Sequence, residues 1–183
     1  MLNVDKLIGK TSNKASFIAP TDDQKTLHKN LEFTAVEQYK LLRTNLSFTL
    51  PDGEGCKVIG VTSSVRGEGK STTAVNLSYV LAEKGRKVLL MDGDLRIPSV
   101  AKKMEIPATP GLTDVLMVRG EYNLSTFKSS ILDTWYILPA GDIPPNPSEL
   151  LGSKRMETVL THLRKFFDCG FFILVVFEIS FYC

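Results

Sequence analysis

A glycine-rich loop that joins a strand to a helix constrains the fold more than any other feature of this chain. Residues 57–62 form an apolar, partly β-branched run, and residues 71–84 repeat apolar side chains at helical spacing. Between them, glycines let backbone N–H groups turn inward around an anion, and the helix N-terminus adds partial positive charge. The common pattern of such a loop is Gly-x4-Gly-Lys-Ser/Thr, and here Ser64 stands at the first glycine. The strand and helix on either side still predict a phosphate-binding loop.

The residues of this loop predict a nucleotide site for ATP and Mg²⁺. Lys70 is placed to bridge the terminal phosphates, and the Ser71 hydroxyl to ligate Mg²⁺. The predicted nucleotide contacts are Arg66, Gly67, Glu68, Gly69, Lys70, Ser71 and Thr72. The alternative is a glycine-rich turn followed by a surface lysine, which the combination of strand, loop, Gly-Lys-Ser and helix disfavours.

Two carboxylates, Asp92 and Asp94, follow the next apolar strand at residues 87–91. Ligands bind at the carboxyl ends of the strands of an open parallel sheet, so both are candidates for the same site. They could reach a hydrated Mg²⁺ or the proton of an attacking hydroxyl, and Arg96 could steady phosphate charge or neutralise the acids. The alternative is an acidic turn with a structural salt bridge. The predicted metal ligands are Ser71, Asp92 and Asp94, and the predicted catalytic residues are Lys70, Asp92 and Asp94.

Strand and helix patterns alternate along the chain. Strands that are apolar on both faces indicate a parallel sheet covered on both sides. We therefore predict the α/β class, with a doubly wound parallel sheet of the P-loop NTPase type and helices on both faces. Residues 1–32 predict a polar lead-in, and residues 33–183 predict one domain. The expected strands are 57–62, 87–91, 135–138 and 171–177, and the expected helices are 34–47, 71–84 and 147–166, with a short one from 111.

Composition excludes some kinds of partner. With 22 basic and 20 acidic side chains the net charge is only +2, so no global basic field favours nucleic acid. Three cysteines without metal-ligand spacing are typical of a reducing cytoplasm. The longest apolar run, residues 171–177, is too short for a membrane helix, which needs about 20 residues. We expect a cytoplasmic protein, without a signal peptide, that reaches the inner face of the membrane only through a partner.

Four motifs occur together between about residue 33 and residue 168. Besides the phosphate loop they are Leu89-Leu-Met-Asp-Gly-Asp-Leu-Arg96, Leu138-Pro-Ala-Gly-Asp-Ile-Pro-Pro-Asn-Pro-Ser-Glu-Leu-Leu151, and the upstream helix Glu37-Gln-Tyr-Lys-Leu-Leu-Arg43-Thr-Asn-Leu46. In combination they resemble the bacterial tyrosine kinases of capsule and exopolysaccharide synthesis. One departure is Arg66, where members of that family often have proline; a flexible cation there could loosen the loop or add a phosphate contact.

The resemblance implies an ATP-binding tyrosine kinase that phosphorylates a C-terminal tyrosine cluster of a neighbouring subunit and regulates capsular or exopolysaccharide synthesis and export. It implies that Lys70 and Ser71 hold phosphates and Mg²⁺, and that Asp92 and Asp94 serve the metal and the incoming tyrosine hydroxyl. It also implies activation by the cytoplasmic tail of a membrane adaptor of the polysaccharide co-polymerase type.

The same resemblance implies a homo-oligomer. The family assembles rings through Glu-x-x-Arg-x-x-Arg on a helix, and here the residues are Glu37, Lys40 and Arg43. On a helical wheel they lie away from a packing stripe of Tyr39 and Leu42, which continues to Leu46. Lysine lacks the bidentate fork of arginine, so Lys40 predicts a weaker ring. The alternative is the solvated face of a surface helix.

The end of the chain departs from the family. A short strand ending in aspartate is expected after Asp168, but no aspartate follows it; Glu178 is the one acid there, and Tyr182 stands in place of a tyrosine cluster. This predicts a gene product truncated or frame-shifted at its C-terminus, with the C-terminal part of the domain missing. Loss of a metal-positioning carboxylate is then expected to weaken phosphoryl transfer.

Two other functions stay open. A catalytically impaired nucleotide-binding module would keep the loop but transfer no phosphate. A partition or division-site ATPase is the third candidate, but that group carries a lysine at the position of Val65, followed by two glycines.

Overall fold

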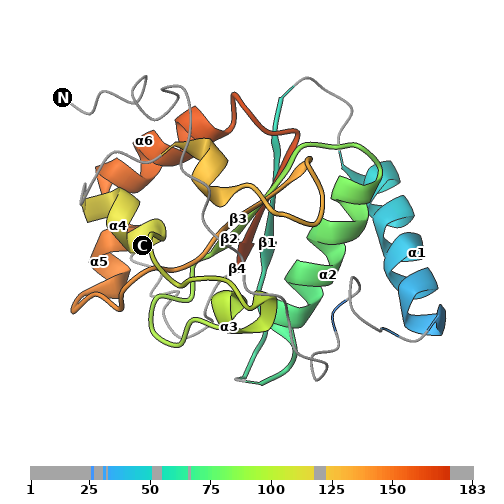
Figure 1. The fold of residues 1–183 in the computed structure, drawn as a ribbon, viewed down its shortest axis with the longest axis horizontal. Coiled ribbons are helices and arrows are strands. Elements are labelled where there is room, and N and C mark those ends of the chain that lie inside the picture. Colours follow the sequence, from blue (N-terminus) through green and yellow to red (C-terminus); the bar gives the residue numbers. More distant parts are fainter. Residues whose placement is uncertain are drawn as a thin grey trace.

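The strands of the chain form one parallel sheet. A computed structural model describes Thr26, Leu31 and residues 33–50, 55–65, 67–117 and 123–173. Its four-stranded sheet has the order β1-β4-β2-β3, and all three neighbouring pairs are parallel (Figure 1). The strands are β1 (Lys57–Val61), β2 (Val88–Asp92), β3 (Trp135–Leu138) and β4 (Cys169–Ile173). The predicted parallel α/β fold is therefore confirmed.

β2 lies between β4 and β3 and is buried along its whole length. Val88 and Leu90 belong to the hydrophobic core on one face of the sheet, whereas Leu89 and Met91 belong to the core on the other. Successive side chains of a strand point to opposite faces, so a strand covered on both sides needs an unbroken apolar run. That requirement explains the apolar sequence of this segment.

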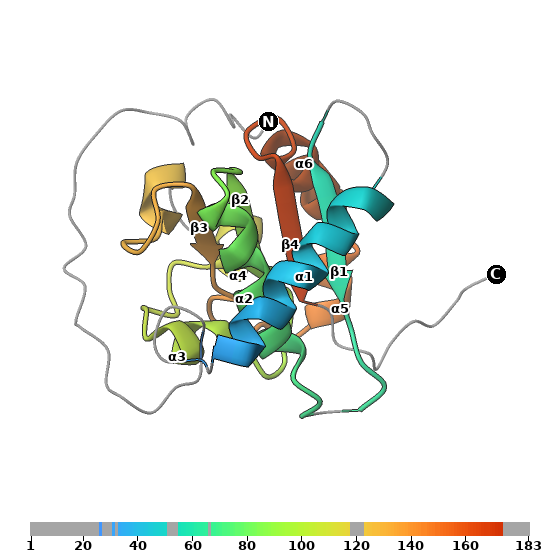
Figure 2. The ribbon, with the colours of Figure 1, turned by 90° about the vertical axis from the view of Figure 1, so that its right-hand side faces the viewer.

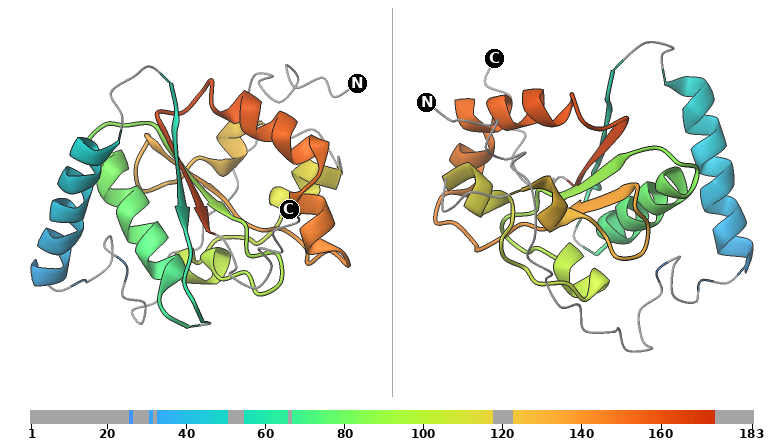
Figure 3. Two further views of the ribbon diagram at one scale, coloured as in Figure 1. Left: turned by 180° about the vertical axis from the view of Figure 1, so that it is seen from behind. Right: turned by 45° about the horizontal axis from the view of Figure 1, so that its top comes forward.

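Helices cover both faces of the sheet (Figure 1). α2 (Lys70–Glu83) packs on one face and contributes side chains such as Val75 and Leu81 to its core. α1 (Phe33–Thr49) contacts α2 and lies outside it, away from the sheet (Figures 2 and 3). The opposite face is covered by helices that include α4 (Leu112–Met117) and α6 (Lys154–Leu163), which bury Leu116 and Val159.

The helix predicted over residues 147–166 is two helices, so that prediction was wrong. α5 (Pro147–Leu151) ends at Gly152, and α6 begins after Ser153, whose backbone is extended. The Ser153 hydroxyl accepts a hydrogen bond from the Met156 N–H at 3.2 Å. A serine that caps a new helix in this way competes with continuation of the previous one. The apolar spacing runs across the break, which hides it from sequence periodicity.

Two short elements have no periodic signal and were not predicted: α3 (Val100–Met104) and the 3₁₀ helix η2 (Leu124–Phe127). β4 begins before the predicted start at residue 171, and residues 174–183 lie outside the described residues. So does the predicted lead-in, except for Thr26 and Leu31. No helix in the described part of the chain has both the length and the apolar content to span a bilayer.

Candidate nucleotide site

The phosphate loop connects β1 to α2, as the sequence predicts. Gly67 and Gly69 have φ angles of 88° and 91°, in the left-handed region that favours glycine. Gly69 is the N-cap of α2, and no side chain caps the helix there. The first N–H groups of a helix without such a cap are free to bind an anion, and the helix dipole favours negative charge at that end.

The Glu68 side chain forms hydrogen bonds with residues earlier in the same loop. Its carboxylate accepts hydrogen bonds from the Val65 N–H at 3.1 Å and from the Ser64 hydroxyl at 3.3 Å. The bond from the Val65 N–H is the main cause that lowers the pKa of Glu68 below its usual value, and the Ser64 hydroxyl adds to it. Glu68 was predicted to contact the nucleotide, and in this structure its side chain holds the turn together.

Lys70 is the first residue of α2 and is partly buried. Within the described residues its ammonium group has no carboxylate partner. A cation beside an open helix N-terminus favours a negatively charged ligand. Thr72 lies partly buried in the same first turn, whereas Arg66 lies outside the described residues.

Asp92 is the last residue of β2 and is completely buried, with 0% of its surface exposed. Three backbone N–H groups donate to its carboxylate, from Asp94 at 3.1 Å and from Ser99 and Val100 at 3.0 Å each. Burial raises the pKa of Asp92, and the three N–H donors oppose that rise. Asp94 is partly buried, and its carboxylate accepts from the Ile97 N–H at 2.8 Å.

Ser99 joins the phosphate loop to the buried acid. Its hydroxyl donates to the Ser71 hydroxyl oxygen at 2.7 Å, while its backbone N–H donates to Asp92. Ser99 is the N-cap of α3, yet its side chain does not cap that helix. Ser99 was not predicted as a site residue, because a single serine outside any motif gives no signal in the sequence. The structure thus brings Ser71 and Asp92 together through a residue that the motif lacks.

The donor set suits Mg²⁺. This ion prefers oxygen ligands and is usually held by one or two carboxylates together with phosphate oxygens and water. Ser71 and Asp92 supply a hydroxyl and a carboxylate around Ser99, and Asp94 follows two residues later. In the described ranges no group of three or more His, Cys, Asp or Glu side chains is arranged to hold a metal ion, so a metal here would complete its shell with phosphate and water.

Arg96 contacts a neighbouring helix. It is exposed, and its Nη2 donates to the Ser148 hydroxyl at 3.3 Å, at the start of α5. A hydrogen bond therefore connects the segment that carries Asp92 and Asp94 to the motif at residues 138–151.

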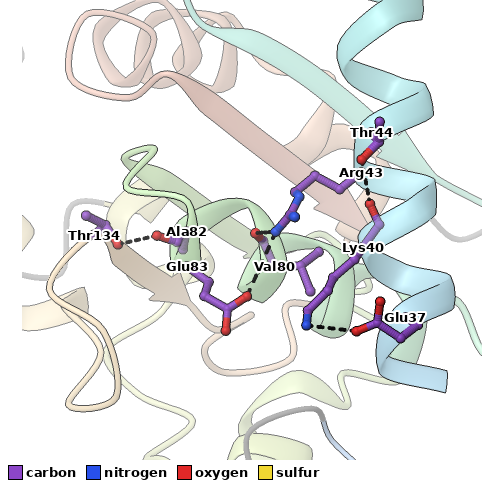
Figure 4. A network of polar contacts seen from close by, with 8 residues as sticks. All are labelled: Glu37, Lys40, Arg43, Thr44, Val80, Ala82, Glu83 and Thr134. Carbon is purple, nitrogen blue, oxygen red and sulfur yellow. Dashed lines mark hydrogen bonds and ion pairs between the residues drawn. The ribbon is translucent and has the colours of Figure 1, made fainter. Parts of the chain in front are cut away.

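The structure corrects the predicted position of Arg43. Its side chain is only 12% exposed, and its Nη1 donates to the Val80 carbonyl oxygen at 2.7 Å (Figure 4). The same atom lies 3.9 Å from the Glu83 carboxylate. Arg43 therefore lies against α2 and not on a face turned away from the packing contact, because a long side chain can reach across to the next helix.

The other two charged residues of that helix pair with each other. Lys40 and Glu37 form an ion pair at 2.9 Å, with 38% and 47% of their side chains exposed (Figure 4). Tyr39 and Leu46 pack against the core as predicted, but Leu42 is 39% exposed and does not continue the stripe.

The profile of the AAA domain family matches residues 56–168, more than half of the chain. The chain is 41% identical over 144 residues to the tyrosine-protein kinase YwqD of Bacillus subtilis (strain 168), covering 78% of this chain and 57% of YwqD. It is 37% identical over 145 residues to the tyrosine-protein kinase CpsD of Streptococcus pneumoniae serotype 4, covering 76% of this chain and 61% of CpsD. The chain thus spans less than two thirds of the length of these relatives.

Solved structures share the fold. The chimerical protein CapA2B2 superposes with a TM-score of 0.69 at 29% identity, covering 78% of this chain and 62% of that one. The kinase domain of the Escherichia coli tyrosine kinase ETK gives 0.69 at 28% identity, with 77% and 55% coverage. The septum site-determining protein MinD of Pyrococcus horikoshii OT3, in complex with Mg-ADP, gives 0.51 at 28% identity, with 64% and 48% coverage.

Proposed function

Because the chain belongs to the AAA domain family and is similar over most of its length to bacterial tyrosine kinases, we propose that it binds Mg-ATP and acts as a protein-tyrosine kinase. The observation that carries the proposal is the link from Ser71 through Ser99 to the buried Asp92. It joins the hydroxyl proposed to ligate Mg²⁺, at the start of α2, to a carboxylate at the end of β2, an arrangement suited to metal-assisted phosphoryl transfer.

The residues of the loop would bind and orient the phosphates. Backbone N–H groups at the open N-terminus of α2 would donate to phosphate oxygens, and the Lys70 ammonium would bridge the β- and γ-phosphates. Mg²⁺, held by Ser71, Asp92 and Asp94, would neutralise the charge that develops during transfer. Asp94 lies nearer the surface than the buried Asp92, so it is the better placed of the two to accept the proton of an incoming tyrosine hydroxyl.

The proposed partners follow from the family. We propose autophosphorylation between subunits, control of capsular or exopolysaccharide synthesis and export, and recruitment from the cytoplasm to the membrane by the tail of an adaptor. The proposed contact between subunits includes Glu37 and Lys40, and α1 also exposes Phe33 (79%), Leu41 (54%) and Phe48 (85%) to a second copy. Arg43 can contribute only in part, since it already donates to Val80.

Lys70→Ala tests the nucleotide site. We expect affinity for a fluorescent ATP analogue with Mg²⁺ to fall about ten- to hundredfold, because a charged hydrogen bond contributes about 1.5–3 kcal/mol. Phosphotyrosine formed with Mg-ATP and an adaptor tail should be lost as well. The matched control is Lys84→Ala, at the exposed C-cap of the same helix, which should bind and react like the unchanged chain.

Two results would contradict the proposal at different levels. Equal ATP affinity of the unchanged chain and Lys70→Ala would exclude the nucleotide site. Lys70-dependent binding without any phosphotyrosine, with the adaptor tail present, would instead identify a binding module.

A further inference from the structure

A cavity opens at the end of the sheet opposite to the phosphate loop, where strands begin. Its volume is about 460 Å³, and it lies where β1 and β4 begin, whereas the phosphate loop follows the end of β1. Small-molecule sites commonly have volumes of about 300–1,000 Å³, so this space can hold a ligand. Neither the nucleotide site nor the contact between α1 and α2 uses it.

Four cations from three separate segments of the chain line this cavity. Lys57 begins β1, Arg86 precedes β2, Arg164 is the C-cap of α6, and Lys165 follows it. Throughout the described ranges none of the four has an ion-pair partner. The whole chain carries a net charge of only +2, so this concentration of positive charge does not simply reflect a basic protein.

Asp168 is the one carboxylate among the described lining residues, and it is turned to the backbone. Its Oδ2 accepts a hydrogen bond from the Lys87 N–H at 2.8 Å. The ammonium group of Lys87 lies 5.5 Å from the centre of the Tyr136 ring and 5.6 Å from that of Phe167, where the rings stabilise its charge. The Asp168 carboxylate therefore binds the backbone just before β2, and the positive charge of the four lining cations is available to an anionic ligand.

We propose that this cavity binds a phosphate group, separately from the nucleotide site. A single carboxylate would leave most of the four cations uncompensated, whereas a phosphate offers up to two charges and several acceptor oxygens. Arg86 and Arg164 suit this ligand, since a guanidinium group can donate two parallel hydrogen bonds to phosphate. The phosphate could belong to a soluble ester or to the headgroup of an anionic lipid.

The first test locates the site on the full chain by NMR. Inorganic phosphate is titrated into the ¹⁵N-labelled protein, and we expect saturable shifts at the amides of Lys57, Arg86, Arg164 and Lys165. In the double variant Arg86→Gln/Arg164→Gln, affinity measured at these amides should fall about tenfold or more. The matched control, Lys84→Gln/Lys154→Gln, has the same net charge as the double variant. Because its two exposed lysines lie outside the lining of the cavity, it should bind phosphate like the unchanged chain.

The second test distinguishes the source of the phosphate. Sedimentation is compared with vesicles of phosphatidylcholine alone and with vesicles that also contain phosphatidylglycerol. Binding to the anionic vesicles that is lost in the double variant but kept in the control assigns the lipid headgroup. Saturation by inorganic phosphate without vesicle binding assigns a soluble ester.

Three results would overturn the proposal: phosphate shifts confined to residues 67–72, equal weakening in both double variants, or no binding in either test. If spectra show that the double variant is unfolded, the single variants Arg164→Gln and Lys165→Gln replace it. Both positions are exposed, so their truncation to glutamine should leave the fold intact.

Discussion

At the scale of single residues, the candidate site depends on one hydroxyl that connects two elements. Ser99 donates its side-chain hydrogen bond to Ser71 and its backbone hydrogen bond to Asp92. Side chains that hold reacting groups in place act through geometry, and small displacements at such sites change activity strongly. We therefore assign Ser99 as a positioning residue of the proposed metal site.

Ser99→Ala should weaken Mg²⁺-dependent nucleotide binding. A neutral hydrogen bond contributes about 0.5–1.5 kcal/mol, so affinity for ATP with Mg²⁺ should fall about two- to tenfold. Affinity without Mg²⁺ should stay unchanged, because Ser71 then has no metal to ligate. Ser99→Thr keeps the hydroxyl and serves as the control. An equal loss with and without Mg²⁺ would show that Ser99 acts on the fold and not on the metal.

Glu68 should titrate at unusually low pH. Its pKa is lowered from about 4.5, chiefly by the Val65 N–H, so the ionised carboxylate stabilises the folded loop above that pH. The stabilisation should disappear as pH falls through the lowered pKa. An NMR titration of the side-chain carboxyl carbon measures this directly. Ser64→Ala should return the value only part of the way, and a pKa at or above 4.5 in the unchanged chain would contradict the described loop.

At the scale of elements, α1 is attached to the domain through α2. None of its residues is fully buried, although Tyr39 and Leu46 pack against the core. Arg43 adds a hydrogen bond to the Val80 carbonyl near the C-terminal end of α2, where helix carbonyls begin to lack partners within the helix. One mostly buried arginine therefore fixes a helix that has little apolar contact of its own.

Arg43→Ala should destabilise the protein by about 1.5–3 kcal/mol, since it removes a charge-assisted hydrogen bond from a side chain that is 12% exposed. Lys40→Ala, on the same helix, removes only an exposed ion pair and should change stability by less than about 1 kcal/mol. Urea unfolding of the two variants measures both values. Equal destabilisation would mean that Arg43 does not anchor α1.

At the scale of the whole molecule, two cores meet across the sheet, and Trp135 joins elements within one of them. Its side chain is completely buried, at 0% exposure, and its Nε1 donates to the Ser78 hydroxyl of α2 at 3.1 Å. Its ring centre lies 5.5 Å from that of Tyr79 in an edge-on arrangement. This contact sets β3 against α2 by shape as well as by a hydrogen bond.

Trp135→Phe should lower the free energy of unfolding by about 2–4 kcal/mol, because it leaves a cavity and removes the donor to Ser78. The control is the next residue, Tyr136→Phe, which keeps its ring on the other face and should cost less than about 1 kcal/mol. Denaturant unfolding followed by circular dichroism compares the two. A loss below about 1 kcal/mol for Trp135→Phe would show that the core adapts to the smaller ring.

Apolar patterns predicted most of the sheet, and the glycine-lysine-serine motif between a strand and a helix predicted the phosphate loop. β3 was predicted over the observed residues, and the other described strands were placed to within two residues at their starts. These features can be predicted from the sequence because a strand buried on both faces requires an unbroken apolar run, and a left-handed turn favours glycine. The break at Ser153 was not predicted from the sequence. A serine can cap a new helix or lie within a continuous one, and the local sequence allows both.

The loop with Lys70 and Ser71, and the acids Asp92 and Asp94, were therefore determined by the sequence as candidates. Only the tertiary structure decided that Ser99 connects them and that Arg43 binds α2. It also decided that four cations from three distant segments of the chain line one cavity. The physical reason is the same in each case: these contacts join atoms from separate elements, and their distances are set by how helices pack on the sheet, which no local pattern encodes.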